Sequence, residues 1–237
     1  MADIAVKWSK FWQSFWVNEG YVRVFSEGLK NTLIIAVAGL VIGIIIGTII
    51  AAFKVMPKYK VFPRIVDGIF SVYVGFFRGT PIVVQLLLAY FVIFPMMGVN
   101  IGSLNTSILV FGLNSGAYIS EMMRAGIQSV DIGQMEAGRA VGLSYSVTMM
   151  KIIVPQAVKN ILPTLGNEFI ALIKETSVAS FVAVVDLYKV FTEIGTSNYE
   201  YLIPYLFMAI IYIVLLMFIT LLIKLMERGL ARSDRRN

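Results

Sequence analysis

The sequence contains no cysteine and no histidine among its 237 residues. The absence of cysteine excludes disulfide bonds and means that thiol chemistry gives no information about the compartment. The absence of histidine removes the commonest metal ligand and the usual acid–base group near neutral pH. Histidine-dependent enzymes are therefore excluded, and a membrane enzyme made from this chain would need a mechanism based on carboxylates.

Charged residues are also scarce, at 14% of the chain, whereas soluble domains carry about 25%. Hydrophobic residues make up 58%. The net charge of +6 comes from basic residues that lie beside apolar segments. This placement favours anionic lipid and membrane orientation over nucleic acid as the explanation of the charge.

A phosphate-binding loop of the form Gly-x4-Gly-Lys-Ser/Thr is missing as well. Any ATP-driven process in which this protein takes part therefore needs a second chain that binds ATP and Mg²⁺ and carries out the hydrolysis. No cofactor is expected in this chain itself, and we predict that it is not an enzyme.

Five apolar segments are long enough to cross a bilayer core of about 30 Å. They cover residues 31–53, 61–94, 106–123, 156–181 and 203–223. The second segment is too long for one simple span, and Gly79 and Pro81 interrupt it. We expect two helical pieces there, at about 64–77 and 81–94, that meet inside the membrane. The sequence thus predicts an all-α integral membrane protein with five transmembrane helices over residues 31–227.

Small residues recur in the first span, where Gly39, Gly43 and Gly47 are spaced four apart. Such a row lies along one face of a helix and lets a neighbouring helix approach closely. We therefore expect the first span to pack tightly against another span along this face.

Basic residues predict the orientation of the chain. Thirteen Lys or Arg residues lie in three segments, namely the connection after the first span, the segment after the third span and the C-terminal tail. They are Lys54, Lys58, Lys60, Arg64, Arg124, Arg139, Lys151, Lys159, Lys224, Arg228, Arg232, Arg235 and Arg236. The two external connections, 95–105 and 186–201, contain Lys189 alone. The tail at 228–237 is therefore predicted to be cytoplasmic and the N-terminus external.

The N-terminal segment, 1–30, has no uninterrupted apolar core of the kind that signal peptides contain. It carries Trp8, Trp12 and Trp16 at helical spacing, with two phenylalanines nearby. This pattern is typical of a helix that lies along the bilayer surface. An aromatic stripe packed on a partner explains it equally well, so both interpretations stay open.

A polar stretch at 132–157 lies between two apolar spans and predicts a short helix, a stop and a return to the membrane. Glu136, Ala137 and Ala140 favour a helix, and Gly142 lies where a helix end calls for positive φ. Pro155 is expected in the first turn of the next helix. A structured loop of this kind, in the segment 128–155, is a place where a soluble partner can bind, although an ordinary connection between helices is the alternative.

Two charged residues of opposite sign are predicted at similar depth inside the membrane. Arg78 lies near the centre of the second segment and Glu168 near the middle of the fourth. Intramembrane charges are costly, so a functional role is the first hypothesis. Arg78, Thr80 and the helix start at Pro81 would suit a carboxylate, while Asn167 and Glu168 would suit an ammonium group. Together they describe a site for an amino acid; a purely structural ion pair is the alternative.

The polar stretch resembles the EAA loop of ATP-binding cassette importer permeases, which reads Glu-Ala-Ala, three residues, Gly, nine residues, Ile-x-Leu-Pro. Here 136–138 is Glu-Ala-Gly, Gly142 follows three residues later, and 152–155 is Ile-Ile-Val-Pro. Gly138 stands for the third Ala and Val154 for Leu. The resemblance implies that Glu136, Ala137, Gly138, Arg139 and Gly142 belong to a coupling helix that docks on a cytoplasmic ATPase subunit.

Three further segments resemble signatures of the polar amino acid permease family. Residues 75–81 with Gln85 are similar to its FRGTPLLVQ signature. Residues 117–127 resemble AYxSExxRGGI, with Ala125 in place of Gly, and 162–178 resemble LPxxxNxxIxLxKxTSL, with Val178 in place of Leu. The likeness extends over about residues 29–228.

This family implies a type I ABC importer permease fold in a bacterial cytoplasmic membrane. It also implies ATP-driven import of histidine, glutamine, glutamate, arginine, lysine or opines by alternating access. The partners implied are a cytoplasmic ABC ATPase, an external amino-acid-binding protein and a second permease subunit, either identical or a paralogue, and nucleic acid is not among them. A membrane channel or a regulatory subunit without active transport is the alternative.

Overall fold

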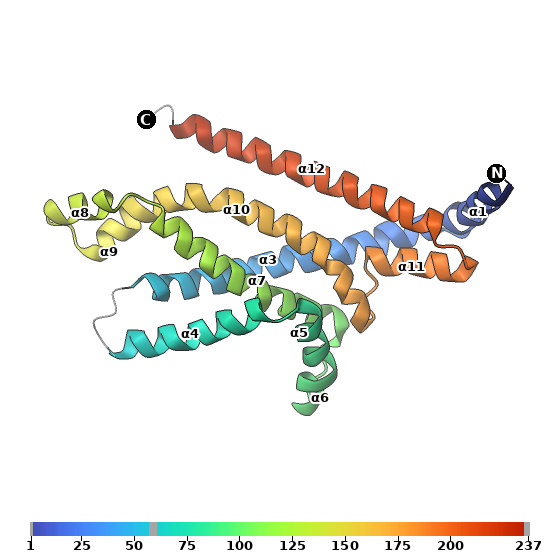
Figure 1. Ribbon diagram of the computed structural model, residues 1–237, viewed down its shortest axis with the longest axis horizontal. Coiled ribbons are helices and arrows are strands. Elements are labelled where there is room, and N and C mark those ends of the chain that lie inside the picture. Colours follow the sequence, from blue (N-terminus) through green and yellow to red (C-terminus); the bar gives the residue numbers. More distant parts are fainter. Residues whose placement is uncertain (1, 57–60, 235–237) are drawn as a thin grey trace. The chain divides into compact units, whose positions relative to one another are not determined.

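The computed structural model describes residues 2–56 and 61–234, and these residues form helices and connections without a β-strand (Figure 1). Lys58, Lys60, Arg235 and Arg236, which enter the predicted orientation, lie outside the described residues. The α-helices are α1 Ala2–Trp12, α2 Gly20–Arg23, α3 Lys30–Val55, α4 Val61–Gly79, α5 Ile82–Leu88, α6 Phe94–Met96, α7 Gly102–Gln128, α8 Ile132–Ala140, α9 Tyr145–Thr148, α10 Val154–Glu175, α11 Leu187–Asn198 and α12 Leu202–Asp234. The π-helical turns are η1 Gln13–Val17, η2 Val24–Leu29, η3 Ala89–Ile93 and η4 Met149–Ile153, and η5 Thr176–Val182 is a 3₁₀ helix.

Two stretches of helix, Gly20–Val55 and Leu202–Gly229, are long and apolar enough to cross a membrane. A third span results if the interrupted pair Val61–Gly79 and Ile82–Met96 is counted as one. Helices α7 and α10 have 27 and 22 residues and therefore the length of a span. Their polar and charged residues lower their hydropathy, so the count of five spans is not established by length and composition.

The predicted interruption of the second segment is confirmed. Helix α4 ends at Gly79, and Pro81 adopts an extended backbone conformation with φ −63° and ψ 137° before α5 begins at Ile82. Proline has no N–H to donate and disfavours helical geometry in the residue before it, which explains the break at this point.

Contacts divide the chain into two compact units. One contains Met1–Gly39, Pro81–Phe111 and Ile170–Ile219, and the other contains Leu40–Thr80, Gly112–Phe169 and Thr220–Asn237. We call them unit 1 and unit 2. Each is described by itself below.

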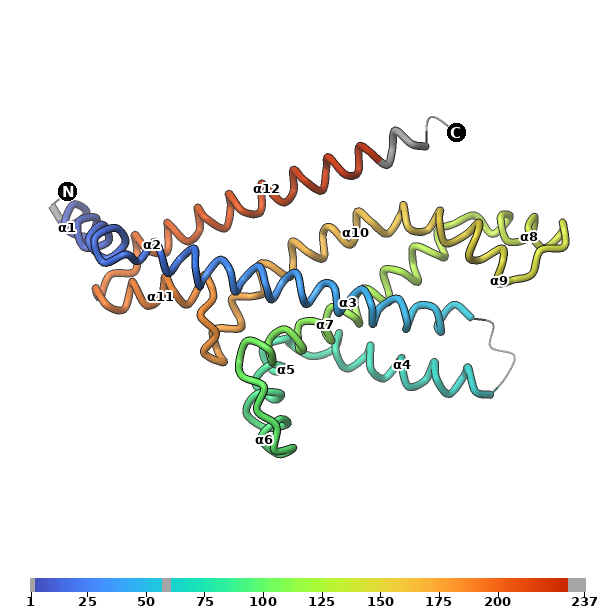
Figure 2. Tube along the Cα trace, turned by 180° about the vertical axis from the view of Figure 1, so that it is seen from behind, coloured from blue at the N-terminus to red at the C-terminus, as the bar shows by residue number. Residues whose placement is uncertain are grey.

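In unit 1, helix α1 packs on α11 and the start of α12 through phenylalanines, as Figure 2 shows for the three helices. Phe11 and Phe15 are buried and contact Phe207, with ring centres 4.6 and 5.9 Å apart. The three tryptophans follow a neighbouring stripe and remain 43–49% exposed. The phenylalanine stripe therefore fixes α1 to the fold, while the tryptophan stripe is available to the surroundings.

Unit 1 also corrects one expectation, because residues 186–201 are not simply an external loop. They contain α11, which begins after Asp186, and the Asp186 carboxylate accepts a hydrogen bond from the N–H of Lys189 at 2.8 Å. Leu187, Val190, Phe191 and Ile194 are buried. Their spacing of three, four and seven is that of an amphipathic helix, a signal already present in the sequence.

In unit 2, α3 and α7 interlock through glycines, which confirms the predicted close approach at Gly43 and Gly47. A Cβ atom on Gly43 would lie 2.8 Å from Ser115, and one on Gly47 would lie 2.7 Å from Ile119. In the opposite direction, Gly112 and Gly116 receive Ile42 and Ile46 at 2.6 and 2.8 Å. Because Cβ atoms do not occur that close to other atoms, only glycine fits these four positions in this packing.

Candidate functional site

The first predicted site residue, Arg78, lies in the last turn of α4 and is exposed within the single chain. Its guanidinium carbon is 5.4 Å from the centre of the Tyr118 ring on α7. A cation over an aromatic face at this distance is stabilised by the charge distribution of the ring. Two hydrogen bonds to backbone carbonyls join α4 and α7 nearby, from Asn114 to Phe77 and from Tyr73 to Leu113.

The second predicted site residue, Glu168, is half-buried on α10 and contacts α7 as well. Ser115 donates a hydrogen bond to its carboxylate at 2.9 Å. Ser115 and Tyr118 are three residues apart on α7 and therefore lie on the same helical face. Arg78 and Glu168 thus reach one turn of α7 from two different helices, and their role in binding stays a prediction.

The two remaining residues of the predicted membrane site have different surroundings. Thr80 follows α4, and its hydroxyl donates a hydrogen bond to the carbonyl of Phe76 at 2.8 Å. Asn167, which precedes Glu168 on α10, is exposed. Sequence reasoning missed Ser115 and Tyr118, although a polar Asn-Ser pair inside the third predicted span was a visible signal.

The predicted coupling segment contains the short helix α8. The Asp131 side chain caps its start by accepting a hydrogen bond from the N–H of Gly133 at 2.7 Å. At its end Gly142 has φ +85°, as predicted, and the N–H of Leu143 reaches the carbonyl of Gly138 at 3.0 Å. This is the Schellman arrangement that ends many helices. Glu136, Ala137 and Arg139 are exposed on α8, where a partner can reach them.

The helical segment that follows α8 begins earlier than Pro155. The next helix begins at Tyr145, where the Ser144 side chain accepts a hydrogen bond from the N–H of Val147, and it continues through η4 into α10. Pro155 is the second residue of α10 and lies in its first turn, as predicted, but no break precedes α10, because α9 and η4 lead directly into it. The preceding turn is π-helical, with the N–H of Val154 bonded to the carbonyl of Met149. The backbone hydrogen-bond pattern is therefore already shifted by one residue at the point where proline has no N–H to donate.

Gly138 is the buried residue of α8, and its neighbour explains why glycine occurs there. A Cβ atom at this position would lie 2.5 Å from Cγ2 of Thr148 on α9. Alanine, which the importer motif has at this position, is thus excluded by the threonine in this packing. The close contact makes α8 and α9 a joined pair.

Charged residues at the end of α3 and on α7 in unit 2 form an ionic cluster. Glu121 contacts Arg124, three residues further along α7, at 2.7 Å, and its other carboxylate oxygen contacts Lys54 on α3 at 2.7 Å. The side chains of Lys54 and Glu121 are only 11% and 18% exposed. Lys54 was not predicted to take part, because the pair joins residues 67 positions apart in the sequence.

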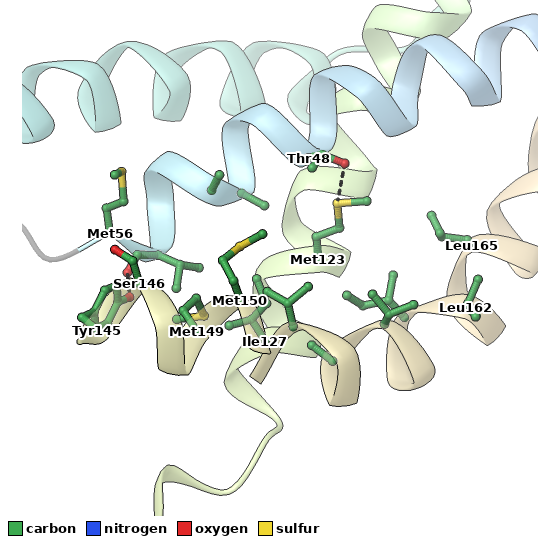
Figure 3. A pocket seen from close by; sticks show the side chains of 17 residues that line it. Thr48, Met56, Met123, Ile127, Tyr145, Ser146, Met149, Met150, Leu162 and Leu165 are labelled. Atoms are coloured by element: carbon green, nitrogen blue, oxygen red, sulfur yellow. Dashed lines mark hydrogen bonds between the residues drawn. The ribbon is translucent and has the colours of Figure 1, made fainter. Parts of the chain in front are cut away.

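An apolar cavity of about 540 Å³ lies in the same unit between α3, α7 and the segment from α9 to α10 (Figure 3). Aliphatic residues and Met56, Met123, Met149 and Met150 supply most of its lining. Tyr145 lies at one end, and its hydroxyl donates a hydrogen bond to the carbonyl of Val55 at 3.2 Å. An apolar lining of this kind does not suit a polar amino acid, so we do not assign the substrate to this cavity.

Long apolar helices that carry Arg78 and Glu168, with the exposed helix α8 between two of them, are typical of helical membrane permeases. The family model for the inner membrane component of binding-protein-dependent transport systems matches residues 39–232, and the chain belongs to this family.

Among curated relatives, the arginine transport system permease protein ArtQ of Bacillus subtilis is 37% identical over 208 residues, which are 88% of this chain and 93% of the relative. The L-cystine transport system permease protein TcyB of the same organism is 36% identical over 229 residues, covering 96% and 93%.

Solved structures agree with this assignment. A crystal structure of an amino acid ABC transporter with histidines has a TM-score of 0.79 and 39% identity, and the match covers 88% of this chain and 95% of that one. An inward-facing MetNI methionine ABC transporter, at 19% identity and a TM-score of 0.71, matches in fold. The all-helical chain thus has the fold of a type I ABC importer permease.

Proposed function

We propose that this chain carries a polar amino acid into the cytoplasm by alternating access. As a member of its family it is the permease component of an amino acid ABC importer, in which a separate subunit hydrolyses ATP. The observation that carries the choice of substrate is the placement of Arg78 and Glu168 beside one turn of α7. The named relatives, which transport arginine and cystine, support the same class of substrate.

The proposed membrane site uses opposite charges for the two ends of a zwitterion. The Arg78 guanidinium, with Thr80 beside it, suits a carboxylate, and the Glu168 carboxylate with Asn167 suits an ammonium group. Arg78 stacks on a ring and Glu168 accepts from a hydroxyl, so both charges are stabilised on the protein before a substrate arrives. A structural ion pair between the same residues is the competing explanation.

We further propose five spans: the two that are long and apolar enough by themselves, the interrupted pair Val61–Gly79 and Ile82–Met96 counted as one, and α7 and α10. The basic residues that flank α3, α7 and α12 favour a cytoplasmic C-terminus and an external N-terminus, because cytoplasmic segments are enriched in Lys and Arg. The bilayer in question is the inner membrane, since the family is an inner membrane component. In this orientation α8 is cytoplasmic.

The partners follow from this orientation. The coupling residues Glu136 to Gly142 contact an ABC ATPase, which binds ATP and Mg²⁺, and an amino-acid-binding protein docks on the external side. A second permease subunit, identical or paralogous, completes the pathway, because one set of five spans offers only half of it. Among the described residues, no group of three or more Asp, Glu, His or Cys side chains is placed to hold a metal ion.

The test of the substrate site is amino acid uptake into vesicles that contain this chain, its ATPase and its binding protein. Arg78→Gln and Glu168→Gln should each lower uptake by about tenfold or more, the effect of losing one hydrogen bond to a charged group. Lys10→Gln, which removes an exposed charge from α1, is the matched control. Normal uptake by both site variants, with unchanged affinity of the binding protein, would mean that the pair is structural.

The test of the coupling segment uses Glu136→Lys, which reverses an exposed charge on α8. The variant should remain in the membrane but lose co-purification with the ATPase and ATP-dependent uptake. Retention of both by the variant would remove α8 from the proposed contact. A channel or regulatory subunit would show no uptake against a gradient even with the complete set of partners.

A further inference from the structure

The cytoplasmic-side end of α3 in unit 2 is joined to two other helices by polar contacts. One joins its last residue, Val55, to Tyr145 on α9, and the other joins Lys54 to Glu121 on α7. These two contacts come from adjacent residues of α3. The end of α3 is therefore a junction between the helix that follows the coupling segment and α7.

The contact to Tyr145 satisfies a backbone group that a helix end leaves open. The last four carbonyls of an α-helix have no partner within the helix, and Val55 is the final residue of α3. The Tyr145 hydroxyl donates to this carbonyl at 3.2 Å. The length of the tyrosine side chain thus ties α9 directly to the backbone of α3 rather than to a mobile side chain.

The contact to α7 is ionic and partly shielded from water. Glu121 uses one carboxylate oxygen for Lys54 and the other for Arg124, both at 2.7 Å. Removing one partner of such a pair leaves an uncompensated charge at a site that is largely buried, so the cluster resists separation. Because Lys54 and Val55 are neighbours, whatever displaces the end of α3 acts on α7 as well.

The other end of this chain of contacts is α8. Gly138 lies so close to Thr148 that α8 and α9 must move together, and Tyr145 lies on the same short helix α9 as Thr148. The contacts thus run from α8 to α9, from α9 to α3 and from α3 to α7. All these residues belong to unit 2.

The apolar cavity explains why movement of α9 reaches α3 mainly through the polar contacts. It separates much of α3 from η4 and α10, and several of its walls are methionines, whose side chains are flexible and adapt to changes of shape (Figure 3). Close-packed cores transmit displacement directly, whereas a cavity lined by adaptable side chains absorbs it. The hydrogen bond at the Tyr145 end therefore decides how much of a movement of α9 reaches α3.

We propose that Tyr145 and the Lys54–Glu121–Arg124 cluster are positioning residues that make α3 and α7 follow the movement of the coupling helix α8. This inference rests on the proposed function, since it takes α8 to be the contact of the ATPase. It assigns to these residues the efficiency with which ATP hydrolysis is converted into transport. They do not contact the amino acid.

The experiment measures ATP hydrolysed per amino acid imported in vesicles that contain the complete transporter. Tyr145→Phe keeps the ring and removes only the hydroxyl that reaches Val55. Tyr73→Phe is the matched control, because the Tyr73 hydroxyl also donates to a backbone carbonyl, that of Leu113, and joins α4 to α7 in the same unit. We expect Tyr145→Phe to raise the ratio about fivefold, the shift in population that loss of one ordinary hydrogen bond produces, and Tyr73→Phe to leave the ratio unchanged.

A second variant keeps the inference testable if Tyr145→Phe assembles poorly. Glu121→Gln has nearly the same shape but no charge, and it should raise the ratio while the amount of complex stays normal. A wild-type ratio in either assembled variant, or an equal rise in Tyr73→Phe, would overturn the inference. Failure of the proposed function looks different, because Glu136→Lys would then keep its ATPase whatever the ratios are.

Discussion

Ser115 on α7 donates a hydrogen bond to the Glu168 carboxylate on α10 at 2.9 Å. One turn further along α7, the ring of Tyr118 lies under the Arg78 guanidinium of α4. A single face of α7 therefore supports two side chains of opposite charge that reach it from separate helices. If these charges bind the two ends of an amino acid, the support on α7 determines their positions.

Tyr118 offers a direct test of this support. Tyr118→Phe keeps an aromatic face beneath Arg78, whereas Tyr118→Leu removes it and forfeits a cation–π contact of about 1 kcal/mol. We expect uptake by the leucine variant to fall about fivefold and uptake by the phenylalanine variant to stay near the wild-type level. Equal losses in both variants would assign the effect to the hydroxyl rather than to the ring.

The contact between Gly138 and Thr148 predicts a substitution that is harmful alone and tolerated in combination. Gly138→Ala places a methyl group against Thr148 and should loosen α8 from α9, lowering uptake and ATPase binding. Adding Thr148→Ala removes the atoms nearest to that methyl group and should restore both activities. Uptake assays of the single and double variants decide the matter, and a double variant no better than Gly138→Ala would contradict the packing explanation.

The tryptophan stripe predicts a location for α1 at the external membrane interface. The ring centres of Trp8 and Phe207 are 5.8 Å apart, and Phe207 lies in the second turn of α12. Trp8 is therefore level with the beginning of a membrane span. Tryptophan is enriched at the membrane–water interface, where a span begins. Because Trp8, Trp12 and Trp16 are the three tryptophans of the chain, its tryptophan fluorescence reports on this stripe alone.

We expect lipids brominated near the headgroup to quench this fluorescence more strongly than lipids brominated at the chain end. Trp8→Phe, Trp12→Phe and Trp16→Phe, made in pairs, separate the contribution of each residue. Strong quenching by aqueous iodide, relieved by adding the binding protein and not by lipid, would instead identify the stripe as a protein contact.

Asp186 predicts a dependence of stability on pH. Burial raises the pKa of its carboxyl from 3.8 to about 7, although the backbone N–H of Lys189 acts in the other direction. The side chain is fully buried, and one of its oxygens lacks a hydrogen-bond partner among the described residues. Because the folded-state pKa lies above the unfolded value, stability should be highest below about pH 4 and fall as the pH rises to about 7.

Ionisation of Asp186 lowers the free energy of unfolding by on the order of 4 kcal/mol at neutral pH. Asp186→Asn keeps an acceptor for the Lys189 N–H at the start of α11 and carries no charge. The melting temperature in detergent should therefore change less between pH 5 and 8 in the variant than in the wild type. At pH 8 the variant should have the higher melting temperature. Parallel curves for the two proteins would show that Asp186 does not titrate in this range.

Features that local chemistry determines were predictable from the sequence. Positive φ at Gly142, the break before Pro81, the glycine row on α3 and the pair of Glu121 with Arg124 each depend on a few neighbouring residues. The class of protein also followed, because four ordered motifs and the long apolar segments agree with each other.

Features that depend on distant residues were not predictable in the same way. No local pattern indicated that Lys54 would contact Glu121, or that Ser115 would contact Glu168, since both contacts depend on how the helices pack. Pro155 lies in the first turn of α10 as predicted, but the helical turns before it were missed, because only the π-turn η4 lets a helix continue into a proline at this position. Helix α11 was missed because its segment is polar overall, although its buried residues repeat with helical spacing.

The four glycines between α3 and α7 have a consequence for how unit 2 can move. Ile42 and Ile46 pack on Gly112 and Gly116, while Ser115 and Ile119 pack on Gly43 and Gly47. The two helices therefore interdigitate, with side chains of each helix opposite glycines of the other. A shift of α3 along α7 by one residue would place an isoleucine opposite a residue that has a side chain, and the two would clash. These parts of α3 and α7 are therefore held in a single register. Any conformational change of the transporter must move them together as one rigid body.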